Sequence, residues 1–177
     1  MNTRMSDGQT LFRTLPGMPV TGPYAEQFTV PGHGTHREGL VVEVTLSDGR
    51  SWVGNFQKGR TGFSEVLLHA NGVDLVVVAG GQGYWVGTEE RKALVTFGEA
   101  IDAVDRIPNS GWILFLNGLE IICFGPSGVA WQTSRYLWNG FRGLTVRGAL
   151  IGGEAWDLDN ERWEPFELKL ATGERMR

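Results

Sequence analysis

The sequence has few of the residues that disulfide frameworks, zinc sites and thiol chemistry require. It contains one cysteine and three histidines in 177 residues. Cys123 lies in the apolar run of residues 119–124, and apolar surroundings raise the pKa of a thiol and lower its reactivity. We therefore predict that Cys123 is a small buried hydrophobic residue, and the absence of disulfide partners favours a reducing compartment.

Clustered positive charge and long apolar stretches are also absent. The formal net charge is −4, from 16 basic and 20 acidic residues, whereas binding a phosphate backbone needs grouped Lys and Arg. No window approaches 18 apolar residues, and residues 1–8 lack the apolar stretch of a signal peptide. We expect no nucleic-acid partner, no membrane association and a cytoplasmic location.

Glycine and tryptophan are abundant instead, with 26 and 7 residues, as is typical of short strands joined by tight turns. Residues 40–46 and 51–56 are β-rich and flank a turn at Asp48 and Gly49, which predicts a hairpin. Asn-Gly turn signals follow at Asn71, Asn117 and Asn139. The pattern predicts an all-β fold, an antiparallel meander of about ten to thirteen short strands.

The domain organisation is predicted from a change in composition. Residues 1–35 are rich in Pro and Gly, which disfavour a long helix or a central strand. We expect an N-terminal arm over 1–35, with an edge strand near 28–30, and a single β domain over 36–177. Residues 99–107 have apolar residues at a period of three, but we assign them to a strand because their neighbours are β.

A weak internal repeat runs through the β domain. Residues 74–97, 111–133 and 143–166 each read as strand, turn, strand, turn and strand. This spacing is typical of the blades of β-propellers, here in an open or small closed arrangement; a β-sandwich or barrel is the alternative. Exposed edges of an open arc would favour a homodimer.

Four short segments carry a resemblance, namely residues 52–56, 80–84, 137–142 and 153–157. In this combination the chain resembles an uncharacterised group of bacterial β-repeat, propeller-like proteins with no assigned activity. The resemblance implies a bacterial source and no particular mechanism.

Acidic residues offer the main candidates for metal binding and catalysis. Asp157, Asp159 and Glu161 place oxygen ligands at alternate positions, as calcium loops do, but the EF-hand spacing is missing and a solvated turn is the favoured interpretation. Glu154, Asp157, Glu164 and Glu167 could supply a carboxylate pair for a hydrolase, although no pair is set apart. We predict no cofactor and no metal, and the sequence favours a non-enzymatic protein while leaving catalytic activity open.

Aromatic residues supply the candidates for binding. We predict a surface formed by Trp138, Phe141, Arg142, Tyr84 and Trp85, because exposed Trp, Tyr and Arg are typical of protein interfaces. The first hypothesis is a non-enzymatic protein-interaction module, and the acidic balance favours a basic partner. The alternatives are a small-ligand or carbohydrate-binding protein and a hydrolase with unidentified carboxylates.

Overall fold

The computed structural model describes residues 10–22, 24–133 and 140–176, which form fifteen β-strands and no helix. None of these residues therefore lies in a helix that could cross a membrane. The all-β prediction is confirmed, with more strands than expected. The strands are β1 (Leu11–Leu15), β2 (Glu26–Phe28), β3 (Leu40–Thr45), β4 (Ser51–Phe56), β5 (Glu65–Leu68), β6 (Leu75–Ala79), β7 (Gln82–Gly87), β8 (Lys92–Phe97), β9 (Ala103–Arg106), β10 (Ile113–Asn117), β11 (Glu120–Gly125), β12 (Gly128–Gln132), β13 (Phe141–Arg147), β14 (Leu150–Asp157) and β15 (Arg162–Lys169).

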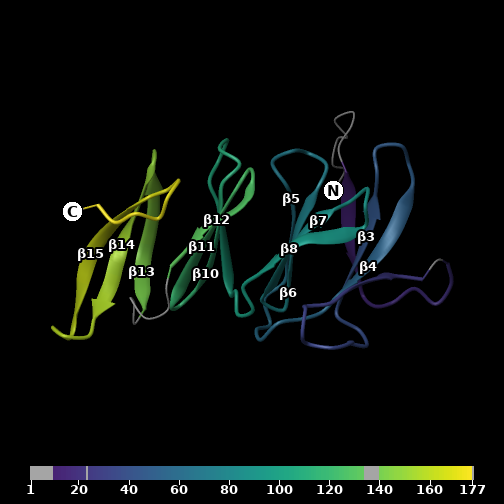
Figure 1. Cartoon of the computed structure of the whole chain (residues 1–177), viewed down its shortest axis with the longest axis horizontal. Helices are drawn as coiled ribbons and strands as arrows, with labels where there is room; N and C mark the ends of the chain where they lie inside the picture. Colours follow the sequence, from purple (N-terminus) through teal and green to yellow (C-terminus); the bar gives the residue numbers. More distant parts are fainter. Residues whose placement is uncertain (1–9, 23, 134–139, 177) are drawn as a thin grey trace. The chain divides into compact units, whose positions relative to one another are not determined.

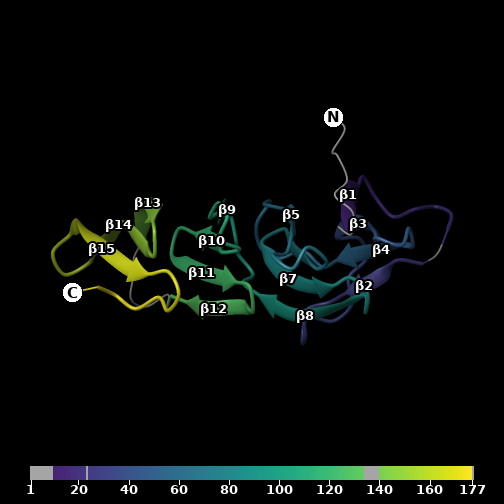
Figure 2. The ribbon, with the colours of Figure 1, turned by 90° about the horizontal axis from the view of Figure 1, so that it is seen from above.

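The strands form four small sheets in two compact units, Met1–Ile101 and Asp102–Arg177. The first unit contains the first sheet, in the order β1-β3-β4-β2, and the second sheet, β5-β6-β7-β8 (Figure 1). The second unit contains the third sheet, β9 to β12, whose strands lie side by side in chain order (Figure 2), and the fourth sheet, β13-β14-β15. Every pairing is antiparallel except that of β2 with β4.

The predicted repeat corresponds to real sheets. Its three segments contain β6 to β8, β10 to β12 and β13 to β15, each set paired antiparallel in chain order. Tight turns make this possible: Gly49, between β3 and β4, has a φ of 86°, a conformation that glycine adopts without steric cost. The ambiguous stretch at 99–107 contains β9, so its assignment to a strand is confirmed.

Two strands form within residues 10–22 and 24–35 of the segment expected to be an arm. β1 pairs with β3, and the edge strand expected near 28–30 begins earlier, at Glu26, and runs parallel to β4. The buried amide of Asn55 fixes the neighbouring chain: it accepts from the Gly39 N–H at 2.8 Å and donates to the Arg37 carbonyl at 2.8 Å. The boundary between an arm and a single β domain stays a prediction.

The core of the first unit lies between its two sheets. Val42, Val44 and Phe56 of the first sheet pack in one cluster with Val77 and Tyr84 of the second. All five residues of β6 are buried. A strand that is buried on both faces explains why residues 75–79 form an unbroken apolar run rather than an alternating one.

The core of the second unit lies between the third and fourth sheets, and the described residues on the other side of the fourth sheet are exposed or half-buried. Leu114 and Cys123 pack against Ile151, Phe166 and Leu168. Along the second half of β15, buried and exposed residues alternate, as expected of a sheet with one buried face. We call the opposite side of the fourth sheet, which points away from this core, the outer face.

Candidate functional site

The outer face is defined by the register of three strands. Residues that are directly paired in an antiparallel sheet point to the same side, and alternate residues of a strand share a face. The pairings therefore place four rows across the outer face: Arg147, Leu150 and Lys169; Thr145, Gly152 and Glu167; Arg142, Glu154 and Pro165; and Trp156 with Trp163.

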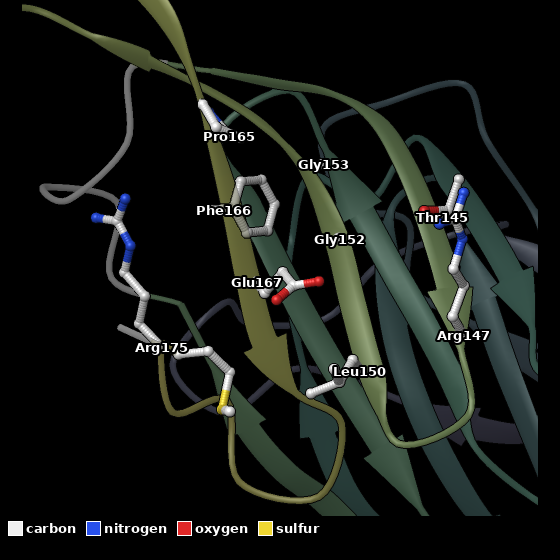
Figure 3. A pocket seen from close by; sticks show the side chains of 10 residues that line it. Thr145, Arg147, Leu150, Gly152, Gly153, Pro165, Phe166, Glu167 and Arg175 are labelled. Carbon is white, nitrogen blue, oxygen red and sulfur yellow. The ribbon is translucent and has the colours of Figure 1, made fainter.

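A hollow of about 1020 Å³ lies over the second of these rows (Figure 3). Gly152 has no side chain, so the centre of this row is lower than its neighbours, which carry Leu150 and Glu154. A Cβ atom at Gly152 would come no closer than 3.7 Å to any neighbouring atom, the Thr145 Oγ1. The hollow therefore lies on the surface of the fourth sheet, over a position that carries no side chain.

The C-terminal tail forms one border of the hollow. The Met176 N–H donates to the Glu167 carbonyl at 2.8 Å, and Arg175 forms a bridge with Leu168. Lys169 forms an ion pair with Glu174 at 2.6 Å, which ties the tail to the end of β15. Arg175 and Met176 are consequently brought to the rim of the hollow.

An aromatic corner, formed by Arg142, Glu154, Trp156 and Trp163, adjoins the hollow. The two indole rings meet edge to face, with centroids 5.4 Å apart. The Arg142 guanidinium lies 4.3 Å from the centroid of the Trp163 ring and donates from Nε to a Glu154 oxygen at 2.8 Å. A cation held between a carboxylate and a π face is well oriented, so this corner presents Arg142 in a fixed position.

Charges on the outer face are unequally satisfied. Arg142 and Lys169 each form an ion pair with a glutamate. Arg147 and Arg175 both line the hollow, and neither forms an ion pair with another described residue. Figure 3 shows them on opposite sides of the hollow, with the carboxylate of Glu167 between them.

Two of the predicted binding residues belong to the fourth sheet. Arg142 lies in the aromatic corner, as described above. Phe141, its neighbour in β13, pairs with Ala155 and is partly buried. Its ring packs against the core of the second unit, on the side of the sheet opposite the outer face. Trp138 lies outside the described residues.

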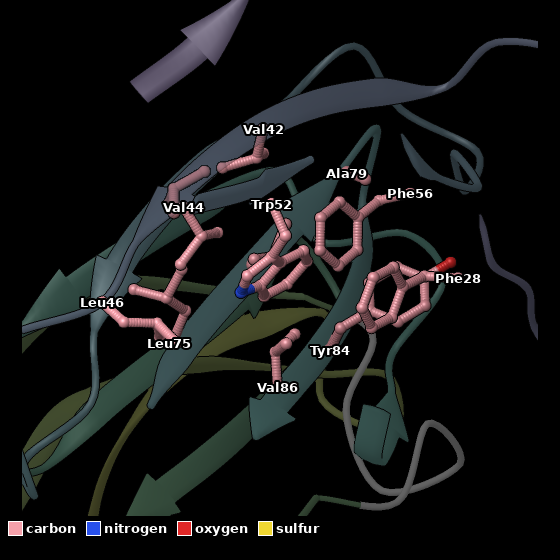
Figure 4. Close-up of a cluster of buried hydrophobic side chains, with 12 residues drawn as sticks. Phe28, Val42, Val44, Leu46, Trp52, Phe56, Leu75, Ala79, Tyr84 and Val86 are labelled. Carbon is pink, nitrogen blue, oxygen red and sulfur yellow. The ribbon is translucent and has the colours of Figure 1, made fainter. Parts of the chain in front are cut away.

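The other two predicted binding residues belong to the second sheet. The Tyr84 ring lies in the core of the first unit with no exposed area (Figure 4), and its hydroxyl donates to the Gln57 carbonyl at 2.7 Å. Burial raises the pKa of Tyr84 above its ordinary value. Trp85 donates to Asp74 at 3.1 Å and stacks on His69. Tyr84 therefore has a packing role, and this pair belongs to the first unit whereas Arg142 belongs to the second.

The carboxylate of Asp157 is used in hydrogen bonds within the turn between β14 and β15. The Asp157 carboxylate accepts from the Asn160 side chain at 2.7 Å and from the Asp159 N–H at 2.8 Å. These bonds lower the pKa of Asp157, the bond from the Asn160 side chain most of all. Glu161 has a φ of 50°. No group of three His, Cys, Asp or Glu suited to a metal occurs in the part of the chain that the structure describes, and the favoured turn interpretation accounts for the bonds that Asp157 makes.

The single cysteine is buried, as predicted. Burial raises the pKa of the Cys123 thiol to about 12, and its sulfur lies 3.5 Å from the Leu170 carbonyl oxygen. The thiolate is the nucleophilic form of cysteine, so Cys123 is a core residue rather than a reactive one.

Sequence reasoning missed the hollow. Its central row, Thr145, Gly152 and Glu167, comes from three strands, and a shift in register between Arg142 and Thr145 sets which residues align. The glycine pair at 152 and 153 within a strand was the available signal, because glycine inside a strand often marks a close approach of another group. Comparison of the sequence with known protein families and with curated proteins found no match.

Proposed function

We propose that the chain is a non-enzymatic protein-interaction module that binds its partner through the outer face of the fourth sheet. The observation that carries the proposal is the aromatic corner, which places Trp156, Trp163 and Arg142 beside the hollow on an open sheet face. Trp and Arg are the residues most enriched among those that dominate binding energy at protein interfaces.

The order already present in the corner supports this function. Arg142 is held by Glu154 and Trp163 before any partner arrives. A preorganised side chain loses less conformational freedom on binding, and that loss costs about 0.5–1.5 kcal/mol for a mobile side chain. The corner is thus suited to contact a partner at a small entropic cost.

The alternative functions have less support from the same face. A carbohydrate would stack on an open indole face, but Arg142 lies over one face of Trp163. A hydrolase needs a pair of carboxylates that is available to substrate, whereas Glu154, one of the two carboxylates in the rows of the outer face, is engaged with Arg142.

We also propose a sheet architecture, a source and a cellular location for the protein. The repeat of local meanders supports blade-like sheets of the propeller kind. The resemblance stated above supports a bacterial source, and the composition supports a cytoplasmic location. Self-association through sheet edges is a further expectation.

The proposal is tested by affinity capture from a lysate of the source organism, with tagged wild-type protein and two variants. Trp163→Ala and Arg142→Gln remove the corner, and Arg13→Gln removes an exposed arginine of similar type on β1, where it pairs with Glu43. We expect a stoichiometric protein partner with the wild type and with Arg13→Gln, and at least about a tenfold loss with the corner variants. Circular dichroism confirms that each variant is folded.

Two results contradict the proposal in different ways. If the wild type captures no protein above an untagged control, the chain is not an interaction module under these conditions of expression. If a partner is captured equally well by all variants, the partner binds elsewhere and the assignment of the outer face is wrong.

A further inference from the structure

The hollow is lined by two arginines that form no ion pair with a described residue, and the proposed function does not involve them. Arg147 at the end of β13 and Arg175 in the C-terminal tail are exposed and lack an ion pair with any described residue, although the other arginines of the fourth sheet have one. Both side chains line the hollow, on opposite sides of Glu167. The hollow therefore carries positive charge at its two ends and negative charge at its centre.

The floor and rim of the hollow between these charges include apolar residues. Gly152 forms the floor, and Leu150, Pro165 and Met176 contribute apolar atoms around it. An apolar side chain that entered over Gly152 would be removed from water, with a gain of about 25 cal/mol for each Å² of apolar surface buried.

The dimensions of the hollow favour a short extended segment. Its central row crosses three strands and continues to the tail beside β15. Neighbouring strands are about 4.8 Å apart, so the row spans roughly 14 Å, which an extended chain covers with about four residues at about 3.3 Å each.

We infer that the hollow binds an extended acidic peptide segment of the partner, with a carboxylate side chain near each end and an apolar residue between them. This inference rests on the proposed function. The end carboxylates would pair with Arg147 and Arg175 in charge-assisted hydrogen bonds, and the apolar residue would lie over Gly152. Glu167 would repel a third carboxylate at the centre, so the pattern differs from that of a uniform polyanion.

An acidic segment differs from the basic partner that the net charge of the chain favours. The acidic balance of the whole chain favours a basic partner, but whole-protein charge acts mainly on long-range encounter. The charges that a bound segment would contact directly are the two arginines and Glu167, and these favour acidic ends.

The test begins with selection from a display library of random peptides on the immobilised full chain, followed by calorimetry with the selected peptides. We expect an enriched pattern with Asp or Glu near both ends of a segment of about four residues and Leu, Met or Phe between them. The double variant Arg147→Gln with Arg175→Gln should weaken binding by at least about tenfold, as expected for the loss of charged partners. Gly152→Val, which fills the floor, should weaken binding by a similar factor.

A matched control separates these contacts from net charge. Arg37→Gln with Lys92→Gln removes two exposed positive charges from the first unit, and this variant should bind the selected peptide as the wild type does. An oligothymidylate of equal charge should not compete, because it would bring phosphates against Glu167.

Three other outcomes would contradict the acidic segment. Each of them can be told apart from a failure of the proposed protein-interaction function. Selected peptides that are neutral or basic, and that lose affinity with Trp163→Ala, would keep the outer face as a protein-binding surface but contradict the acidic segment. Failure to select any peptide, together with a captured partner that depends on Trp163, would show that the partner is not an extended segment. Competition by oligothymidylate would show that the hollow accepts anions without the proposed pattern.

Discussion

The second and fourth sheets are built from the same meander, yet their strands have different surroundings. All five residues of β6 are buried, whereas β15 buries Phe166 and Leu168 and exposes Glu167 and Lys169. The unbroken apolar run of β6 leaves no position free for polar chemistry. The alternating pattern of β15 supplies a whole face whose residues are not required by the core, and the candidate site lies on that face.

The largest expected difference between the two sheets is in the unfolding free energy that is lost when a leucine is replaced by alanine. Leu75→Ala in β6 removes a side chain with no exposed area, and such changes cost about 2–5 kcal/mol of unfolding free energy. Leu150→Ala on the outer face of β14 removes a half-buried side chain and should cost less than about 1 kcal/mol. Urea denaturation of both variants measures the difference. Equal losses would show that the outer face is packed as tightly as the second sheet.

A smaller effect distinguishes the two faces of the fourth sheet. At Gly153 a Cβ atom would lie 3.0 Å from Leu144 and Phe166 side-chain atoms and 3.1 Å from the Arg142 carbonyl oxygen, whereas at Gly152 the nearest atom would lie at an ordinary van der Waals distance of 3.7 Å. Gly153→Val should therefore lower the unfolding free energy by about 1–3 kcal/mol, the usual cost of overpacking. Gly152→Val should leave the thermal midpoint nearly unchanged. A large loss at Gly152 would contradict the assignment of the hollow to the outer face.

A third effect concerns the core beneath the outer face and appears only at alkaline pH. The pKa of Cys123 is raised by burial from 9.0 to about 12. Above pH 9 the unfolded chain loses this proton while the folded chain keeps it, so stability falls as pH rises, by at most about 1.4 kcal/mol per pH unit until pH 12. Below pH 9 both states are protonated and the thiol contributes no pH dependence.

The measurement is the pH dependence of unfolding free energy between pH 8 and about 11 in wild type and Cys123→Ala. Other titrating groups, Tyr84 among them, contribute equally to both proteins, so the difference in slope isolates the thiol. We expect a shallower fall in the variant. Identical slopes would mean that the core under the fourth sheet admits water.

The sequence predicts strands well where turn chemistry and apolar pattern agree. The hairpin around Asp48 and Gly49 and the three repeated meanders appear within a few residues of their predicted positions. The strand β1 was missed because the Pro and Gly content around it favours irregular chain, and only its pairing with β3 reveals it.

The sequence does not show which of the predicted binding residues are exposed, for a physical reason. Tyr84 and Arg142 look alike in sequence as polar residues of a strand, and only tertiary packing shows that one is buried and the other exposed. The hollow depends on the alignment of Thr145, Gly152 and Glu167 across three strands. A change of one residue in register would turn these side chains to the other face, and sequence alone does not fix register at that accuracy.

The parallel pairing of β2 with β4 has a consequence for the order of folding. Paired Gln27 and Asn55 are 28 positions apart, whereas Asn117 and Glu120, paired across a tight turn, are 3 apart. Closing the longer loop costs more chain entropy before any contact compensates for it. We therefore expect the local meanders to form first and the segment with β2 to join β4 late, onto a hairpin that already exists.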